Sequence, residues 1–259
     1  MRRLATFVFV IILSCAGIDT ALAQSQTTRV VVHVRAQDAK FVGTSMGGVQ
    51  IIIRNSQTGE LLAKGVTAGS TGDTEKLMKS PERRYTQLST PGAAKFETNI
   101  KLDEPVLARI EAYGPLGQPQ SAVHLSREQW LIPGKDMVGD GILLTLPGFA
   151  VDVVAPRAHQ FVGAMGQDGI PIRANVVMMC GCPITEGGLW NSEQYDVKAI
   201  INHNGQKVTE MPLNFANEAS LFKGYFTPQE QGSYEITVYA YDSKSGNTGV
   251  DKTTVVVTE

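Results

Sequence analysis

The sequence predicts an all-β fold, made of two consecutive antiparallel β-sandwich domains that follow a cleaved signal peptide. Short segments in which apolar and polar residues alternate recur along the chain, as in TRVVVHVR at 28–35 and GSYEITVYAYD at 232–242. Such alternation is typical of strands with one buried face. Turn-forming residues separate the segments, and Pro147-Gly148 interrupts the pattern near the middle. We therefore expect sandwich domains at residues 24–146 and 147–259.

The first 23 residues have the pattern of a secretory signal peptide. Arg2 and Arg3 precede an apolar run at 4–15 that is too short to span a bilayer, and Ala21-Leu22-Ala23 forms a small-x-small cleavage site. We therefore expect a periplasmic or secreted protein. A lipid anchor on Cys15 is the alternative, because residues 12–15 loosely resemble a lipoprotein box.

In the first half, the segment GGVQIIIRNSQTGELLAKGVTAGSTGD at 47–73 combines a β-branched strand, a Thr-Gly turn and a return strand. This arrangement resembles the transthyretin-like or carboxypeptidase-regulatory-like sandwich. We expect the strands of this half at 28–35, 49–54, 61–63, 95–101, 106–113 and 142–146.

Residues 67–94 break the rhythm of the strands with a long polar insertion. A short helical turn is expected near Glu75 to Lys79. Long loops in compact domains are usually functional or mobile. Both a mobile surface excursion and a binding loop are consistent with this segment.

The second half contains about seven strand-like segments in about 110 residues, the number found in an immunoglobulin-like sandwich. Its final segment, GSYEITVYAYDSKSGNTGVDKTTVVVT at 232–258, reads as a long hairpin. It resembles the last two strands of bacterial immunoglobulin-like and fibronectin-like modules. That resemblance implies a fold and carries no activity with it.

Sulfur is concentrated in one stretch, VVMMCGCPITEGGLWN at 176–191. Cys180 and Cys182 are the only cysteines after residue 23. On an extended strand their Cα atoms would lie about 6.5–7 Å apart on one face, which is at the long end for a disulfide. Gly181 permits a turn that would bring them closer. Trp190 is expected to fill the sandwich core.

A strand through this stretch would place Met178, Cys180 and Cys182 on one face. Thiolates and thioethers favour Cu(I) over harder ions, so these three residues are a candidate Cu(I) site. The MCGCPI motif is similar to those of envelope copper-handling proteins, which implies a chaperone, sensor or assembly factor that passes the metal to an acceptor. A local Cys180–Cys182 disulfide in a structural or protein-interaction protein, and a pair of unused thiols, are the alternatives.

Other functions find little support in the sequence. The formal net charge is −2 without a basic block, so nucleic acid is not an expected partner. The sequence contains no phosphate-binding loop. A thiol–disulfide oxidoreductase is a third alternative, which is disfavoured because the C-x-C motif lacks the C-x-x-C spacing of thioredoxin-like enzymes. We expect a protein that is not an enzyme and that binds an envelope protein partner or a metal acceptor.

Overall fold

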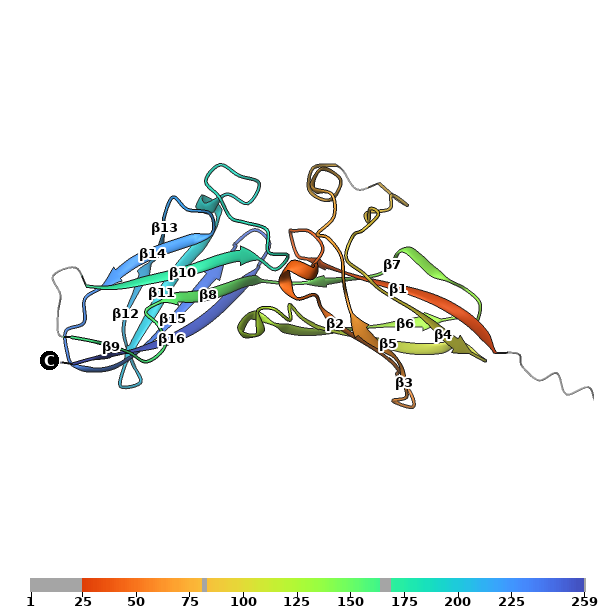
Figure 1. Ribbon diagram of the computed structural model, residues 1–259, viewed down its shortest axis with the longest axis horizontal. Coiled ribbons are helices and arrows are strands. Elements are labelled where there is room, and N and C mark those ends of the chain that lie inside the picture. Colours follow the sequence, from red (N-terminus) through yellow and green to blue (C-terminus); the bar gives the residue numbers. More distant parts are fainter. Residues whose placement is uncertain (1–24, 81–82, 164–168, 259) are drawn as a thin grey trace, which may run out of the picture.

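The computed structural model describes residues 25–80, 83–163 and 169–258, and the expected signal peptide with its Cys15 lies outside them. Two β-sandwiches lie end to end and give the molecule an elongated shape (Figure 1). The predicted all-β fold with two consecutive sandwiches is confirmed. Among the described residues, helical structure is confined to single turns of three to five residues.

The first sandwich pairs a three-stranded sheet, in the order β4-β1-β7, with a four-stranded sheet in the order β3-β2-β5-β6. Apolar side chains that alternate along β2 and β5, such as Ile51, Ile53 and Ile110, are fully buried between the sheets. The strands are β1 (Gln26–Ala36), β2 (Gln50–Asn55), β3 (Leu61–Val66), β4 (Phe96–Leu102), β5 (Val106–Gly114), β6 (Val123–Leu131) and β7 (Met137–Leu146).

Not every strand pair is antiparallel. β1 and β7 run parallel, with Val32 opposite Ile142 and Ala36 opposite Leu146. In the second sandwich, the short β9 runs parallel to β16. The predicted antiparallel sandwiches therefore also contain two parallel pairs. Because β1 and β7 run in the same direction, both strands end at the boundary with the second sandwich (Figure 1).

The polar insertion at 67–94 packs over β1. Its predicted helical turn is present as η2 (Glu75–Lys79), a single turn of π-helix. Leu77 of this turn forms a small separate core with Phe41, Ala93 and Ala94. The insertion therefore explains why β1 is buried on both faces from Val30 to Val34. Much of this segment is part of the folded domain.

The second sandwich pairs a four-stranded sheet, in the order β13-β14-β10-β8, with a five-stranded sheet in the order β12-β11-β15-β16-β9. Tyr234, Ile236, Val238 and Ala240 face the core from β15, as their alternation in sequence predicts. The strands are β8 (Phe149–Ala155), β9 (Gln160–Val162), β10 (Ile170–Met178), β11 (Asp196–His203), β12 (Gln206–Pro212), β13 (Asn214–Phe215), β14 (Leu221–Phe226), β15 (Gly232–Tyr241) and β16 (Thr248–Val257).

The boundary between the sandwiches is itself buried. β7 ends at Leu146 and β8 begins at Phe149, and both residues are fully buried. One continuous apolar core extends from the first sandwich through this boundary into the second. The three-residue turns η1 (Thr44–Met46) and η3 (Pro119–Ser121) approach the boundary from the first sandwich, and η4 (Ser192–Gln194) lies in the second sandwich.

Candidate functional site

The two cysteines lie in a tight hairpin directly after β10. The amide of Gly181 donates to the carbonyl oxygen of Met178 at 2.7 Å, and the amide of Met178 donates to the carbonyl oxygen of Cys182 at 3.2 Å. Gly181 has a φ of 76°, in the left-handed region that favours glycine. The three residues 179–181 thus form a hairpin loop that ends in a left-handed glycine. We call residues 177–183 the CGC hairpin.

Cys180 and Cys182 form a disulfide, with a Cα–Cα distance of 5.4 Å. This distance is shorter than that of an extended strand, because Gly181 turns the chain between the cysteines. The expected common face of Met178, Cys180 and Cys182 is therefore corrected: β10 ends at Met178, and the twofold alternation stops there. Of the alternatives left open by the sequence, the local disulfide is the one present in the structure.

The two methionines before the cysteines are core residues. Met178 is fully buried and continues the inward face of β10 formed by Ile172, Ala174 and Val176. Met179 is 1% exposed, and its methyl group lies 3.2 Å from the position that a Cβ on Gly148 would occupy. Both side chains therefore fill the second sandwich near its boundary with the first.

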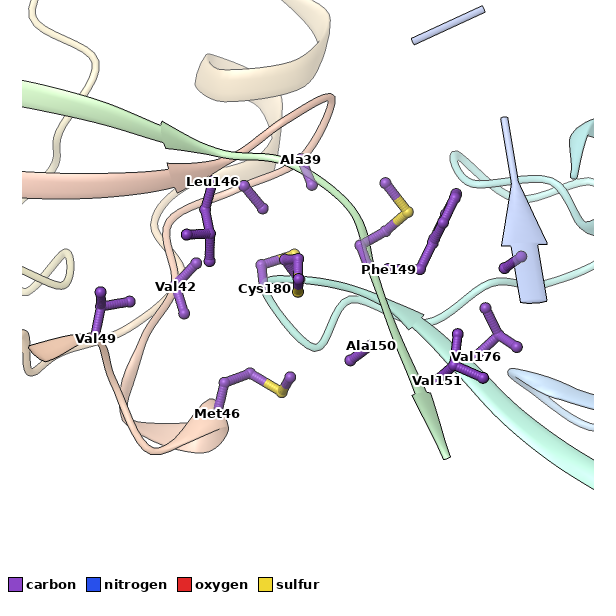
Figure 2. Packing of buried hydrophobic residues seen from close by; sticks show 14 of the residues in the cluster. Ala39, Val42, Met46, Val49, Leu146, Phe149, Ala150, Val151, Val176 and Cys180 are labelled. Atoms are coloured by element: carbon purple, nitrogen blue, oxygen red, sulfur yellow. The ribbon is translucent and has the colours of Figure 1, made fainter. Parts of the chain in front are cut away.

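The CGC hairpin inserts between the two sandwiches. Figure 2 shows Cys180 between Val42, Leu146 and Met46 on one side and Phe149 and Ala150 on the other. Cys180 is 1% exposed and Cys182 5% exposed, so the disulfide is shielded from solvent. The hairpin is an apolar wedge at the junction of the two domains.

Met46 of η1 is the contact from the first sandwich at the tip of the hairpin. Its Sδ lies 2.8 Å from the position that a Cβ on Gly181 would occupy. A side chain at position 181 would therefore collide with Met46. The glycine serves both the left-handed turn and the close approach of the two domains.

Polar contacts surround this apolar wedge. The indole Nε1 of Trp190 donates to the carbonyl oxygen of Asp38 at 2.9 Å. Gln37 donates through Nε2 to the carbonyl oxygen of Ser245 at 2.5 Å, and Nδ2 of Asn247 donates to the carbonyl oxygen of Gln37 at 3.0 Å. The turn after β1 is thus held by two separate loops of the second sandwich.

A second set of polar contacts lies at the start of β8. Ser121, from η3 of the first sandwich, accepts a hydrogen bond from the amide of Val151 at 3.0 Å through its Oγ. The side chain of Gln120 donates to the carbonyl oxygen of the same valine at 3.0 Å. The first sandwich therefore satisfies backbone groups of the second on this side of the junction as well.

Burial at the junction favours the neutral forms of Asp38 and Tyr195. Burial raises the pKa of Asp38, the negative charge of Asp242 raises it further, and Arg35 and Lys244 oppose this shift. Burial also raises the pKa of Tyr195, with smaller contributions from Asp38 and Asp242. Asp242 itself is buried and accepts from the amides of its own turn at Lys244 and Ser245.

The Cu(I) prediction for Cys180, Cys182 and Met178 concerns the reduced protein and stays a prediction. In the oxidised hairpin the two sulfur atoms are bonded to each other. Within residues 25–80, 83–163 and 169–258, no three His, Cys, Asp or Glu side chains gather as a metal site. Met46, which was not among the predicted ligands, is the thioether that the fold brings to the hairpin from a distant segment.

His33, His203 and Trp190 make contacts that stabilise the fold. His33 is buried, with Nδ1 2.7 Å from the carbonyl oxygen of Ala94, as expected for a structural histidine. The ring of His203 stacks on Tyr234 at a centroid distance of 4.4 Å. Trp190 is buried as expected, and its bond to Asp38 was not foreseen.

In the part of the chain that the structure describes, no helix has the length and apolar character needed to cross a membrane. No protein-family model and no curated protein sequence matches the chain.

Several solved structures show a weak similarity to this chain. They include fibronectin(III)-like modules of Clostridium thermocellum CbhA, at 12% identity and a TM-score of 0.29 over 90% of this chain and 94% of that chain. The chicken interferon gamma receptor alpha chain matches at 10% identity and a TM-score of 0.30, covering 92% of this chain and 100% of that chain. An engineered protein matches at 14% identity and a TM-score of 0.33, covering 50% of this chain and 24% of that chain. The transthyretin-like resemblance of residues 47–73 stays a prediction.

Proposed function

We propose that this chain is an exported, non-enzymatic interaction protein that presents two β-sandwiches to a protein partner in one fixed orientation. The observation that carries the proposal is the CGC hairpin, a disulfide-closed loop of the second sandwich seated against Met46 of the first. A flexible linker would need none of these contacts, whereas a fixed spacing of two binding surfaces requires them. The disulfide suits the oxidising compartment to which the leader of residues 1–23 would direct the chain.

The shielding of the disulfide supports a structural role for it. Cys180 and Cys182 are almost fully buried, and reactive cysteines are at least partly exposed. Closing a loop with only one residue between the cysteines removes little entropy from the unfolded chain. We therefore assign the disulfide to the shape of the hairpin tip and not to the global stability of the protein.

The decisive experiment compares the chain from residue 24 onward with its Cys180→Ser/Cys182→Ser variant by small-angle X-ray scattering and residual dipolar couplings. We expect each sandwich to stay folded in the variant, while the two sandwiches lose their common alignment. If both proteins give one alignment tensor for both sandwiches, the disulfide does not fix the orientation. If the wild type gives two independent tensors, the proposal of a fixed pair fails.

A second candidate function is Cu(I) binding by the reduced hairpin. It is favoured by the position of Met46, which brings a further thioether to the place where both cysteines lie. Binding requires a two-electron reduction of the disulfide by an external dithiol, followed by loss of a proton from each thiol as the thiolates ligate the metal. Met178 would be a ligand only after rotating out of the core.

This candidate is tested by anaerobic titration of the reduced chain with Cu(I) against a competing chelator. We expect one tightly held equivalent, absent from Cys180→Ser/Cys182→Ser and weakened in Met46→Leu. Weakening in Met178→Leu would identify Met178 as the ligand instead. No bound copper at any chelator concentration would reject the candidate and leave the interaction protein.

A further inference from the structure

The outer face of the sheet β13-β14-β10-β8 carries a hollow of about 270 Å³ at some distance from the CGC hairpin. Arg173 of β10 and Lys223 of β14 line it, together with Tyr225 and Glu218. All four side chains belong to exposed residues of the second sandwich. The hollow therefore combines two cations, one aromatic ring and one carboxylate on a solvent-facing sheet.

The two cations are direct neighbours. Arg173 and Lys223 are cross-strand partners in the ladder between β10 and β14, so their side chains leave the same face of the sheet. Like charges in directly opposite positions destabilise a sheet. Neither side chain makes an ion pair or a hydrogen bond with another described residue. A local conflict of this kind is typical of a functional surface.

The other residues of the hollow suit a ligand with a ring and hydroxyl groups. Tyr225 is 57% exposed and lies opposite Pro171, next to the cation pair in the same ladder. An exposed tyrosine offers a flat apolar face and a polar hydroxyl. Glu218 lines the same hollow and can accept hydrogen bonds from hydroxyl groups.

The strand pairing argues against a peptide that adds to the sheet. Arg173 lies on a strand that is paired on both sides, with Lys223 in β14 and with Ala155 in β8. At this position no free edge is available for main-chain pairing with a bound peptide. Recognition by Arg173 therefore uses its side chain, which suits a compact ligand that carries its own negative charge.

From these observations we propose that the hollow binds an acidic sugar, a uronic acid unit of an anionic glycan. Arg173 and Lys223 bind the carboxylate, Arg173 in a bidentate manner. Tyr225 packs against the face of the sugar ring, and Glu218 accepts hydrogen bonds from its hydroxyl groups. This binding is independent of the CGC hairpin and goes beyond the proposed orientation of the two sandwiches.

The test is an NMR titration of the ¹⁵N-labelled chain from residue 24 onward with a galacturonic acid trisaccharide. We expect saturable shifts at Arg173, Lys223 and Tyr225, and an affinity that falls as salt is added. The Arg173→Gln/Lys223→Gln variant should lose at least about tenfold in affinity, which corresponds to 1.4 kcal/mol. Tyr225→Ala should weaken binding while leaving the salt dependence unchanged.

The matched control is Lys198→Gln/Lys252→Gln, which removes the same charge from the outer face of the five-stranded sheet and should bind as the wild type does. A neutral galactose trisaccharide and a triglutamate peptide complete the comparison. No binding of the acidic trisaccharide, or equal binding of the neutral one, overturns the proposal. Equal or tighter binding of triglutamate identifies an acidic peptide surface instead and also overturns it. None of these results depends on the orientation of the two sandwiches.

Discussion

The indole of Trp190 and the carbonyl oxygen of Asp38 are joined by a hydrogen bond of 2.9 Å across the junction of the two sandwiches. The two residues are 152 positions apart in the sequence. Trp190 follows the CGC hairpin, and Asp38 lies in the turn after β1. The bond therefore connects the loop that carries the disulfide to the first sandwich at a second point, beside the contact of the hairpin with Met46.

Replacing Trp190 with phenylalanine removes this hydrogen bond and keeps an aromatic ring in place. We expect a loss of about 1–2 kcal/mol in the free energy of unfolding, because the carbonyl of Asp38 loses its donor and the smaller ring fills less space. Urea denaturation measures this loss. The control is Trp130→Phe on β6, where the side chain is 53% exposed, and its effect should stay within about 0.5 kcal/mol. Equal losses in both variants would contradict the role of the bond.

Alanine at position 181 tests the approach of the two domains. Gly181→Ala places a methyl group against Met46 and also strains a backbone with a φ of 76°. The matched control is Gly187→Ala, which has a similar φ of 64° and no atom within 4 Å of the new Cβ. In both variants the free energy of unfolding should fall by about 1 kcal/mol or more because of backbone strain. The fall should be larger in Gly181→Ala, because its new methyl group also meets Met46.

The excess in Gly181→Ala over its control should shrink in a Met46→Ala background, because the colliding atom is gone. A double-mutant cycle measured by denaturation gives this coupling directly. A coupling near zero would mean that the hairpin tip and η1 do not meet in solution.

Asp38→Asn should stabilise the protein at neutral pH. The pKa of Asp38 is raised in the folded state, so ionisation of Asp38 favours unfolding once the pH exceeds its ordinary value of 3.8. The substitution removes this penalty. The gain should be less than about 1 kcal/mol, because Asp38 is only partly withdrawn from solvent and its charge is still screened. The melting temperatures of the two proteins should differ at pH 7 and coincide below the ordinary pKa of Asp38. A gain in stability that persists at this low pH would show that ionisation of Asp38 is not its cause.

Asp140→Asn should loosen the polar insertion. Burial opposes ionisation of Asp140, but the amides of Leu88 and Ser89 donate to its carboxylate at 2.6 and 2.7 Å, and its pKa is lowered. The carboxylate thus stabilises the fold above its ordinary pKa of 3.8, and this contribution disappears as the pH falls through the lowered value.

We expect the free energy of unfolding of Asp140→Asn to be about 1 kcal/mol lower than that of the wild type at pH 7. The amide hydrogens of Leu88 and Ser89 should also exchange faster in this variant. The difference from the wild type should vanish in acid. Asp103→Asn, in the exposed turn between β4 and β5, is the control and should leave these amides unchanged. Unchanged exchange at pH 7 in Asp140→Asn would show that the carboxylate does not hold the insertion.

The strands with alternating burial could be predicted because their pattern follows directly from a sheet with one buried face. β15 is the clearest example, with Tyr234 and Ile236 inward and Glu235 outward. β6 was not predicted, because its segment contains Arg127 and Glu128 on exposed positions and has only one fully buried residue near its end. β9 and β13 are too short, at three and two residues, to give a pattern.

The position of the cysteines could be recognised as unusual, but not their surroundings. The sequence indicates that Gly181 permits a turn, and it leaves metal binding and a disulfide as alternatives. The partners of the hairpin, Met46 and the turn at Asp38, are more than 130 residues away in the sequence, and no local pattern refers to them. The pairing of Arg173 with Lys223 could not be predicted either, because cross-strand register depends on the folded sheet.

The parallel pairing of β1 with β7 has a mechanical consequence. β1 enters the first sandwich from its outer end, and β7 leaves it toward the second sandwich at Leu146 (Figure 1). Tension between the outer ends of the molecule would therefore pull these two neighbouring strands in opposite directions along their length. The hydrogen bonds between them would be loaded together in shear, rather than opened one after another from an end. The first sandwich is thus built to bear a stretching force along the axis of the pair.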